Sequence, residues 1–267
     1  MKQVTLLDMA ISFVKASACG NDFLIIEGAL ASPDLAELTR RLCDRRNGMG
    51  ADGVEWLFPA QDADIDAQLW NADGSAAEIS GNGTRCVAAY ICAEKGKERV
   101  VIRTGAGLRS CTLTARSGPA YEFETEMGKP EVAAELTLPT SFGQARGLPV
   151  SMGNPHYVIF VETFAPTWPK EAAEVQSNAL FPQGVNVEMV VVQNLHNLEA
   201  RFFERGVGET QSSGTGSCAS AVAAIASARC QSPVRVQAPG GAQMVRWQNQ
   251  VLLRGWAQLV CRGEYFG

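Results

Sequence analysis

Two serines, Ser80 and Ser213, each stand directly before a Gly-x-Gly turn that leads into an alanine-rich segment. If each segment is a helix, its first backbone N–H groups have no partner within the helix and carry partial positive charge. Glycines let a bound anion approach such a backbone closely. The pattern therefore predicts two sites for a carboxylate or phosphate, at Ser80-Gly81-Asn82-Gly83 and Ser213-Gly214-Thr215-Gly216.

Competing interpretations of these turns must be weighed. Serine is a leading N-cap residue, so an ordinary cap is favoured for either turn alone. Residues 214–219 fit the loose dinucleotide-binding motif, but residues 206–213 separate them from the preceding strand, and no Asp or Glu lies between Gln211 and Gly263. The phosphate-loop motif fails because no lysine follows the last glycine. The matched pair of turns favours one shared anion site.

Asparagine recurs beside glycine in the loops between expected strands, at residues 71–75, 153–156 and 184–187. Each such pair alone is usually a turn. The sequence allows either a structural or a functional role for His156. Together with Glu204 and Arg205, these loops suit a small zwitterion that carries carboxylate and ammonium groups.

The elements that must position these residues are mostly strands. Leucine spacing predicts a helix over residues 33–46, and single strands are expected over 148–163, 250–257 and 258–265, although Pro155 suits only an edge or a bulge. After residues 128–130 the chain starts again, so each half contains strands, one alanine-rich helix and more strands. This repeat predicts two similar domains that face each other across a cleft.

Composition narrows the function further. The 267 residues carry a formal net charge of -5, which argues against nucleic acid as a partner. No apolar run is long enough for a membrane span, and the eight cysteines form no CxxC pair, so no metal site is expected. Scattered cysteines fit reduced thiols in a cytoplasmic protein, with Cys92, Cys111 and Cys261 expected in the core.

The same motifs, in order along residues 11–267, resemble the diaminopimelate epimerase family, whose members are cofactor-independent amino-acid epimerases of bacterial lysine and cell-wall synthesis. The motifs that carry the resemblance are residues 19–23, 50–53, 71–75, 81–86, 152–156, 184–187 and 204–210.

The resemblance implies an α+β fold with two pseudo-symmetric domains, each a curved, mostly antiparallel sheet around a central helix, with the active site in the cleft between them. The domains would comprise residues 1–126 with 256–267, and 127–255. The reacting carboxylate would bind the backbone at Gly81, Asn82, Gly214 and Thr215. The distal carboxylate and amine would bind Asn71, Asn154, Asn186 and Arg205, with Glu204 and the Asn21 loop nearby.

The sequence departs from the family at the chemistry. The family uses two cysteines, one before each Gly-x-Gly turn, as thiolate base and thiol acid on opposite faces of Cα, whereas this chain has Ser80 and Ser213. A helix N-terminus can bring a thiol pKa into the working range, but a serine hydroxyl is almost never ionised near neutral pH. Cys86 and Cys218 lie inside the helices and should point elsewhere. Ser17 replaces a histidine that is frequent in the family.

Several interpretations stay open. Either the two cysteines were replaced to trap an inactive enzyme with its ligand, or the chain is a natural relative with altered chemistry. Replacement is slightly favoured, because restoring cysteine gives two ordinary family sequences. The expected function is epimerisation of LL- to meso-diaminopimelate, inactive or impaired with two serines. The alternatives are a binding protein without turnover and a racemase of another amino acid, and a homodimer is left open.

Overall fold

The computed structural model describes residues 10–28 and 34–266, which divide into two compact units. Unit 1 comprises the described residues up to Thr125 and those from Trp256, and unit 2 comprises Glu126–Gly255. In the described part of the chain, none of the helices combines the length and the apolar character needed to cross a membrane.

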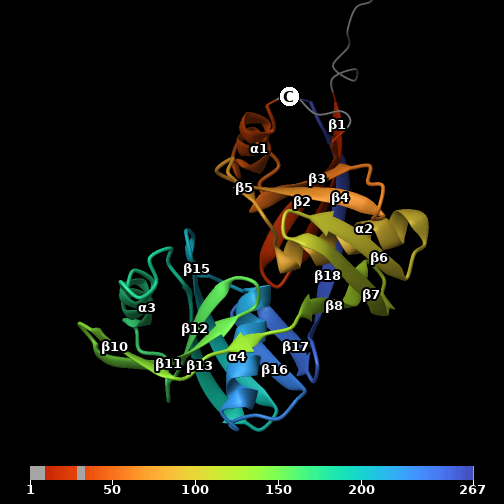
Figure 1. Ribbon diagram of the computed structural model, residues 1–267. Helices are drawn as coiled ribbons and strands as arrows, with labels where there is room; N and C mark the ends of the chain where they lie inside the picture. The colour runs from red at the N-terminus through yellow and green to blue at the C-terminus, as the bar shows by residue number, and fades with distance from the viewer. Residues whose placement is uncertain (1–9, 29–33, 267) are drawn as a thin grey trace, which may run out of the picture. The chain divides into compact units, whose positions relative to one another are not determined.

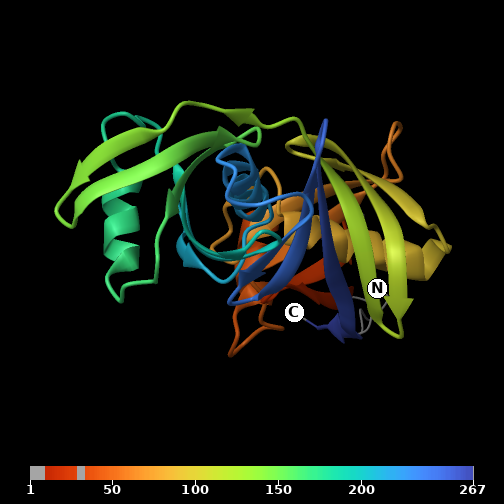
Figure 2. The same cartoon turned by 90° about the horizontal axis from the view of Figure 1, so that it is seen from below.

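Unit 1 is a mostly antiparallel sheet that closes around one helix. Its strands follow the order β18-β1-β2-β3-β4-β6-β7-β8, and β8 pairs with β18 again. Helix α2 (Gly81–Lys95) packs against β1, β2, β4, β6 and β7, and Figure 2 shows it among these strands. The strands are β1 (Ile11–Ala18), β2 (Asn21–Glu27), β3 (Gly53–Phe58), β4 (Ile65–Asn71), β5 (Ala76–Ala77), β6 (Arg99–Thr104), β7 (Gly107–Ser117), β8 (Ala120–Gly128) and β18 (Val251–Tyr265).

The sheet of unit 1 is covered on both faces, and β3 shows how its side chains divide between them. Val54 and Trp56 belong to the core that includes Leu38 and Leu42 of α1 (Leu35–Cys43). The Trp56 indole donates a hydrogen bond to Thr39 Oγ1 of α1 over 3.0 Å. Because side chains alternate along a strand, Glu55 lies on the opposite face, against α2.

Unit 2 repeats this plan around α4 (Gly214–Ala226), which packs against β9, β11, β12, β13, β14, β16 and β17 (Figure 1). A second helix, α3 (Trp168–Gln176), covers the other face of β13. The strands are β9 (Glu131–Val132), β10 (Leu136–Thr140), β11 (Gly143–Ser151), β12 (Pro155–Phe160), β13 (Asn186–Asn194), β14 (Asn197–Glu204), β15 (Gly208–Thr210), β16 (Val234–Ala238) and β17 (Gly241–Trp247).

The internal repeat extends to strand pairing. The parallel pair β2 and β3 in unit 1 corresponds to the parallel pair β12 and β13 in unit 2, and most other pairings are antiparallel. The predicted α+β fold of two similar halves, each a mostly antiparallel sheet around a central helix, is confirmed.

Several local predictions were wrong. Residues 148–163 form two antiparallel strands, because a turn with Gly153 at φ +94° separates β11 from β12. The two strands expected over residues 250–257 and 258–265 are one strand, β18 (Val251–Tyr265), with a register shift opposite Lys15 and Ala16 of β1. Helix α3 was missed, since its proline at the first turn and short length hide the helical period. The expected helix start at residues 32–33 lies outside the described residues, and α1 begins after the cap Asp34.

The expectation for the cysteines was right in two cases of three. Cys92 and Cys111 are buried, whereas Cys261 is exposed, because it lies where β18 turns both faces toward solvent. Cys86 and Cys218 are fully buried in their helices. Burial also raises the pKa of the Cys86 thiol, so neither position offers an accessible thiolate.

Candidate active site

Ser80 is the N-cap of α2. Its backbone is extended, with φ -121° and ψ 123°, and its Oγ accepts a hydrogen bond from the Gly83 N–H over 3.1 Å. Its carbonyl accepts a second bond from the Thr84 N–H. The capping interpretation is therefore correct for Ser80, and its side chain is half-buried.

Ser213 caps α4 in nearly the same way. Its φ and ψ are -138° and 128°, and its Oγ accepts from the Gly216 N–H over 3.1 Å. Burial raises the pKa of the neighbouring Glu204 carboxyl, although the hydroxyls of Thr210, which donates to it over 2.7 Å, and of Ser213 lower it. The two turns thus share one cap geometry but differ in their polar neighbours.

A buried glutamate lies beside each capped turn. Glu55 is the third residue of β3 and Glu188 the third residue of β13. A Cβ atom at Gly83 would overlap Glu55 Oε1, and one at Gly216 would lie 2.9 Å from Glu188 Oε1. Only glycine therefore fits at the third position of either turn, and a carboxylate borders both helix starts.

The two glutamates have different partners. Glu188 Oε1 lies 2.7 Å from His156 Nδ1, and burial raises the pKa of Glu188 although His156 lowers it. The other ring nitrogen, Nε2, lies 3.0 Å from Asn154 Oδ1, and the Asn154 amide donates to Thr215 Oγ1. His156 therefore connects Glu188 to the start of α4. Among the described residues, none forms a hydrogen bond or ion pair with Glu55, and burial raises the pKa of Glu55 to about 8.

Asn21 and Asn82 hold the start of α2 against the turn between β1 and β2. The Asn82 amide donates to Asn21 Oδ1 over 2.8 Å, and the Asn21 amide donates to Asp52 Oδ2 over 3.1 Å. The fully buried Arg85 donates to Asn82 Oδ1. The orientation of Asn82 is therefore set by Arg85 on its own helix and by Asn21, which lies 61 residues away in the sequence.

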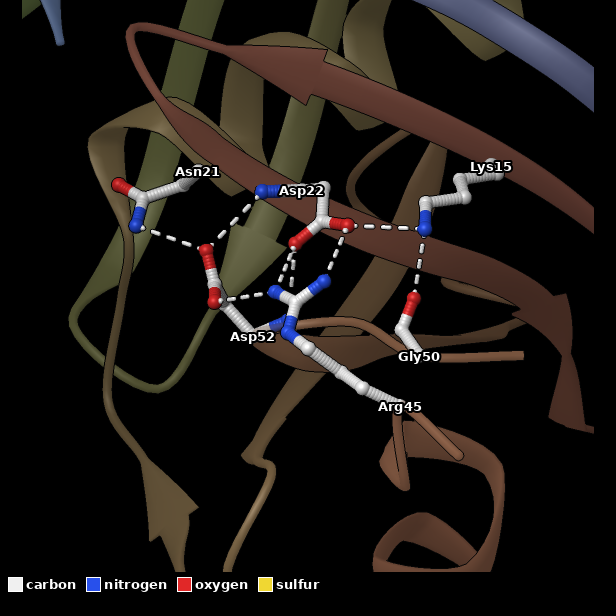
Figure 3. A network of polar contacts seen from close by, with 6 residues as sticks. All are labelled: Lys15, Asn21, Asp22, Arg45, Gly50 and Asp52. Carbon is white, nitrogen blue, oxygen red and sulfur yellow. Dashed lines mark hydrogen bonds and ion pairs between the residues drawn. The ribbon is translucent and has the colours of Figure 1, made fainter. Parts of the chain in front are cut away.

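A charged network anchors the same turn (Figure 3). Asp22 pairs with Lys15 over 2.8 Å and with Arg45 over 2.7 Å, and Arg45 also pairs with Asp52. Burial raises the pKa of Asp22, but the bonds from Arg45 and Lys15 outweigh it, so the pKa is lowered. A lowered carboxyl pKa stabilises the fold above the unfolded pKa, and the stabilisation is lost as pH falls through the folded pKa.

We expect Asp22→Ala to lower the free energy of unfolding by about 2 kcal/mol at pH 7, because Lys15 and Arg45 lose a charged acceptor. The matched control is Asp62→Ala, whose ion pair with Arg103 is exposed and contributes little. Urea unfolding at pH 7 and pH 3 measures both. Equal losses for the two variants at pH 7 would show that the network does not stabilise the turn.

The remaining expected site residues have local partners. Asn71 donates to Ser75 Oγ over 3.0 Å within its own turn. Asn186 uses both ends of its amide, donating to the Pro155 carbonyl and accepting from the Arg205 N–H, each over 2.9 Å. Arg205 has an exposed side chain that borders a hollow of about 470 Å³ in unit 2. Asn186 therefore positions the Arg205 loop.

Sequence reasoning missed Glu55 and Glu188. The signal was present as one charged residue inside each apolar strand, in Gly53-Val54-Glu55 and Asn186-Val187-Glu188. A carboxylate is rarely fully buried without a partner or a role. A glutamate inside an apolar strand therefore indicates a candidate site residue at both positions.

Comparison with known proteins identifies relatives along nearly the whole chain. The sequence profile described as diaminopimelate epimerase matches residues 13–133 and 148–260. The diaminopimelate epimerase of Caldanaerobacter subterraneus subsp. tengcongensis is 35% identical, over 94% of this chain and 98% of that protein. Those of Moorella thermoacetica and Sphingopyxis alaskensis are each 36% identical, over 95% and 96% of this chain and 98% and 97% of theirs.

Solved structures show the same fold at low identity. A hydroxyproline epimerase from Agrobacterium vitis superposes with a TM-score of 0.73 at 16% identity, covering 96% of this chain and 92% of its own. A Bacillus anthracis protein of the PhzF family gives 0.70 at 15% identity, covering 96% and 99%. The full-length matches in sequence show that this chain is an isomerase of the diaminopimelate epimerase family.

Proposed function

We propose that the protein binds diaminopimelate in the cytoplasm and interconverts its LL and meso forms by moving a proton at Cα, without a cofactor. The observation that carries this proposal is the pair of capped helix starts at Ser80 and Ser213, which share one geometry and occupy the positions of the two family cysteines. Two-base epimerisation needs a proton-transferring group on each face of Cα, so the bound state must bring both positions to one ligand.

The binding roles follow from the chemistry of the side chains. Backbone N–H groups at the two helix starts suit the reacting carboxylate, at Gly81, Asn82, Gly214 and Thr215. The Arg205 guanidinium suits the distal carboxylate, because it can bind bidentately and its side chain is exposed. Asn71 and Asn154, with Glu204 and the Asn21 loop, would complete the recognition of the amine groups, and Asn186 would act by holding Arg205.

The serines make this chain an impaired epimerase. General acid–base catalysis works best when the catalytic pKa lies near the operating pH. The pKa of an unassisted serine hydroxyl lies far above that pH. We therefore propose that turnover is far slower than in a chain with thiols at positions 80 and 213, while binding is retained.

We expect diaminopimelate to bind more tightly than histidine or proline in parallel calorimetric titrations of the unmodified chain. Arg205→Gln should weaken the binding of diaminopimelate by about 30-fold or more, since the bidentate, charge-assisted bond to the distal carboxylate is lost. Arg235→Gln, also exposed in unit 2, is the matched control and should bind as the unmodified chain does. Tighter binding of proline or histidine would instead favour a racemase of that amino acid.

Because both serine positions lack a thiol, the chain could be an impaired enzyme or a binding protein without turnover. A measurement of turnover distinguishes the two. Measurable conversion of LL- to meso-diaminopimelate by the unmodified chain would exclude a purely binding role. Tight binding with no exchange of the Cα proton would support one.

A further inference from the structure

Glu55 is a buried carboxylic acid whose surroundings offer it no charge partner. It lies on the face of β3 that packs on α2 and is 3% exposed. Its neighbours across the sheet are Ile25 of β2 and Leu69 of β4. The ionisable groups around the first turns of α2 are Arg85 and Cys86 on the helix, with Cys19 and Asp22 on the adjoining turn. Among the described residues, none of them pairs with Glu55.

The side chains of Glu55 and Ser80 border the same small space beside Gly83. A Cβ atom at Gly83 would overlap Glu55 Oε1 and lie 3.3 Å from Ser80 Cβ, so both side chains border the space that this glycine leaves open. Ser80 is half-buried, whereas Glu55 is fully buried. A ligand at the start of α2 would therefore meet Ser80 first, with the carboxylate behind it.

We propose that Ser80 and Glu55 form a proton relay, in which Glu55 acts through the Ser80 hydroxyl on the Cα proton of the bound amino acid. This inference rests on the proposed function. Ser80 and Glu55 share no hydrogen bond in the free protein, so the Ser80 hydroxyl must first turn toward the Glu55 carboxylate when the ligand binds. As the Cα–H bond breaks, its proton then passes to Ser80 Oγ, the Ser80 O–H proton passes to a Glu55 carboxylate oxygen, and the electron pair stays on the substrate as its carbanion. Reversal of these transfers returns a proton to Cα.

The relay supplies what a lone serine lacks. A hydroxyl becomes an effective base only when an adjacent group takes its proton in the same step. Burial raises the pKa of Glu55 to about 8, so the carboxyl changes protonation near neutral pH, where general acid–base catalysis is most effective. Glu188 differs, because His156 already lies 2.7 Å from its oxygen.

The test is exchange of the Cα proton of diaminopimelate in deuterium oxide, followed by NMR across pH 6 to 10. We expect slow exchange by the unmodified chain that rises with pH as Glu55 ionises. Glu55→Gln should reduce the rate by about 100-fold or more and abolish this pH dependence. Ser80→Ala should do the same, and the double variant should be no slower than either single variant, as expected for residues that act as a unit.

The controls separate this inference from the proposed function. Glu98→Gln alters an exposed glutamate of unit 1 and should leave exchange unchanged. Glu55→Asp retains an acid and should keep the pH dependence at a reduced rate, and it serves if Glu55→Gln does not fold. Failure of diaminopimelate to bind would overturn the proposed function. Binding without any exchange would also overturn the proposed epimerisation and would favour a binding protein. Exchange that survives Glu55→Gln would overturn only the relay.

Discussion

The double variant Ser80→Cys/Ser213→Cys is expected to exchange the Cα proton of diaminopimelate at least about 1,000-fold faster than the unmodified chain. Each general acid or base contributes roughly 100- to 10,000-fold, and both positions gain a group with a pKa near neutrality. The capped turns at Gly83 and Gly216 place each new thiol at a helix N-terminus, where partial positive charge favours the thiolate.

The measurement is NMR exchange in deuterium oxide together with conversion of LL- to meso-diaminopimelate. Each single variant should gain far less, because one face of Cα then lacks its thiol. Ser117→Cys/Ser227→Cys adds one thiol to each unit away from the helix starts and should gain nothing. If the double variant binds diaminopimelate but does not exchange its Cα proton, the assignment of positions 80 and 213 as the two bases is wrong.

The central helices and their caps could be predicted because the signals are local. Serine before Gly-x-Gly followed by small apolar residues specifies a capped helix from about ten consecutive residues. Both Ser80 and Ser213 occupy the expected cap. Helix α3 was missed for the converse reason, since its nine residues include a proline at the second position and bury only three side chains, which leaves little helical period to detect.

The surroundings of the turns could not be predicted, because they depend on pairings distant in sequence. Alternation normally marks which face of a strand is buried, but α1 and α2 cover both faces of β3, so every residue from Gly53 to Leu57 is buried. The face of Glu55 follows only from the observed packing. Likewise, Asp22 and Arg45 are 23 residues apart, and only the folded chain brings them together.

The buried Glu55 also makes the stability of the protein depend on pH. In the unfolded chain the carboxyl has its ordinary pKa of 4.5, whereas burial raises the folded pKa to about 8. Between these values the folded state holds a proton that the unfolded state has released, so stability falls as pH rises from 4.5 to about 8 and changes no further above it. At about 1.4 kcal/mol per pKa unit, the total loss is roughly 3 to 5 kcal/mol.

Glu55→Gln removes this ionisation, so we expect its free energy of unfolding, relative to the unmodified chain, to increase by roughly 3 to 5 kcal/mol between pH 4.5 and pH 9. Urea unfolding of both full chains at several pH values measures this difference, and the comparison cancels other groups such as Asp22. Glu98→Gln should show no trend, because its side chain is exposed. If the difference in unfolding free energy between Glu55→Gln and the unmodified chain does not change with pH, Glu55 ionises as it does in water. Ser80 would then have no neighbouring proton acceptor with a pKa near neutral pH.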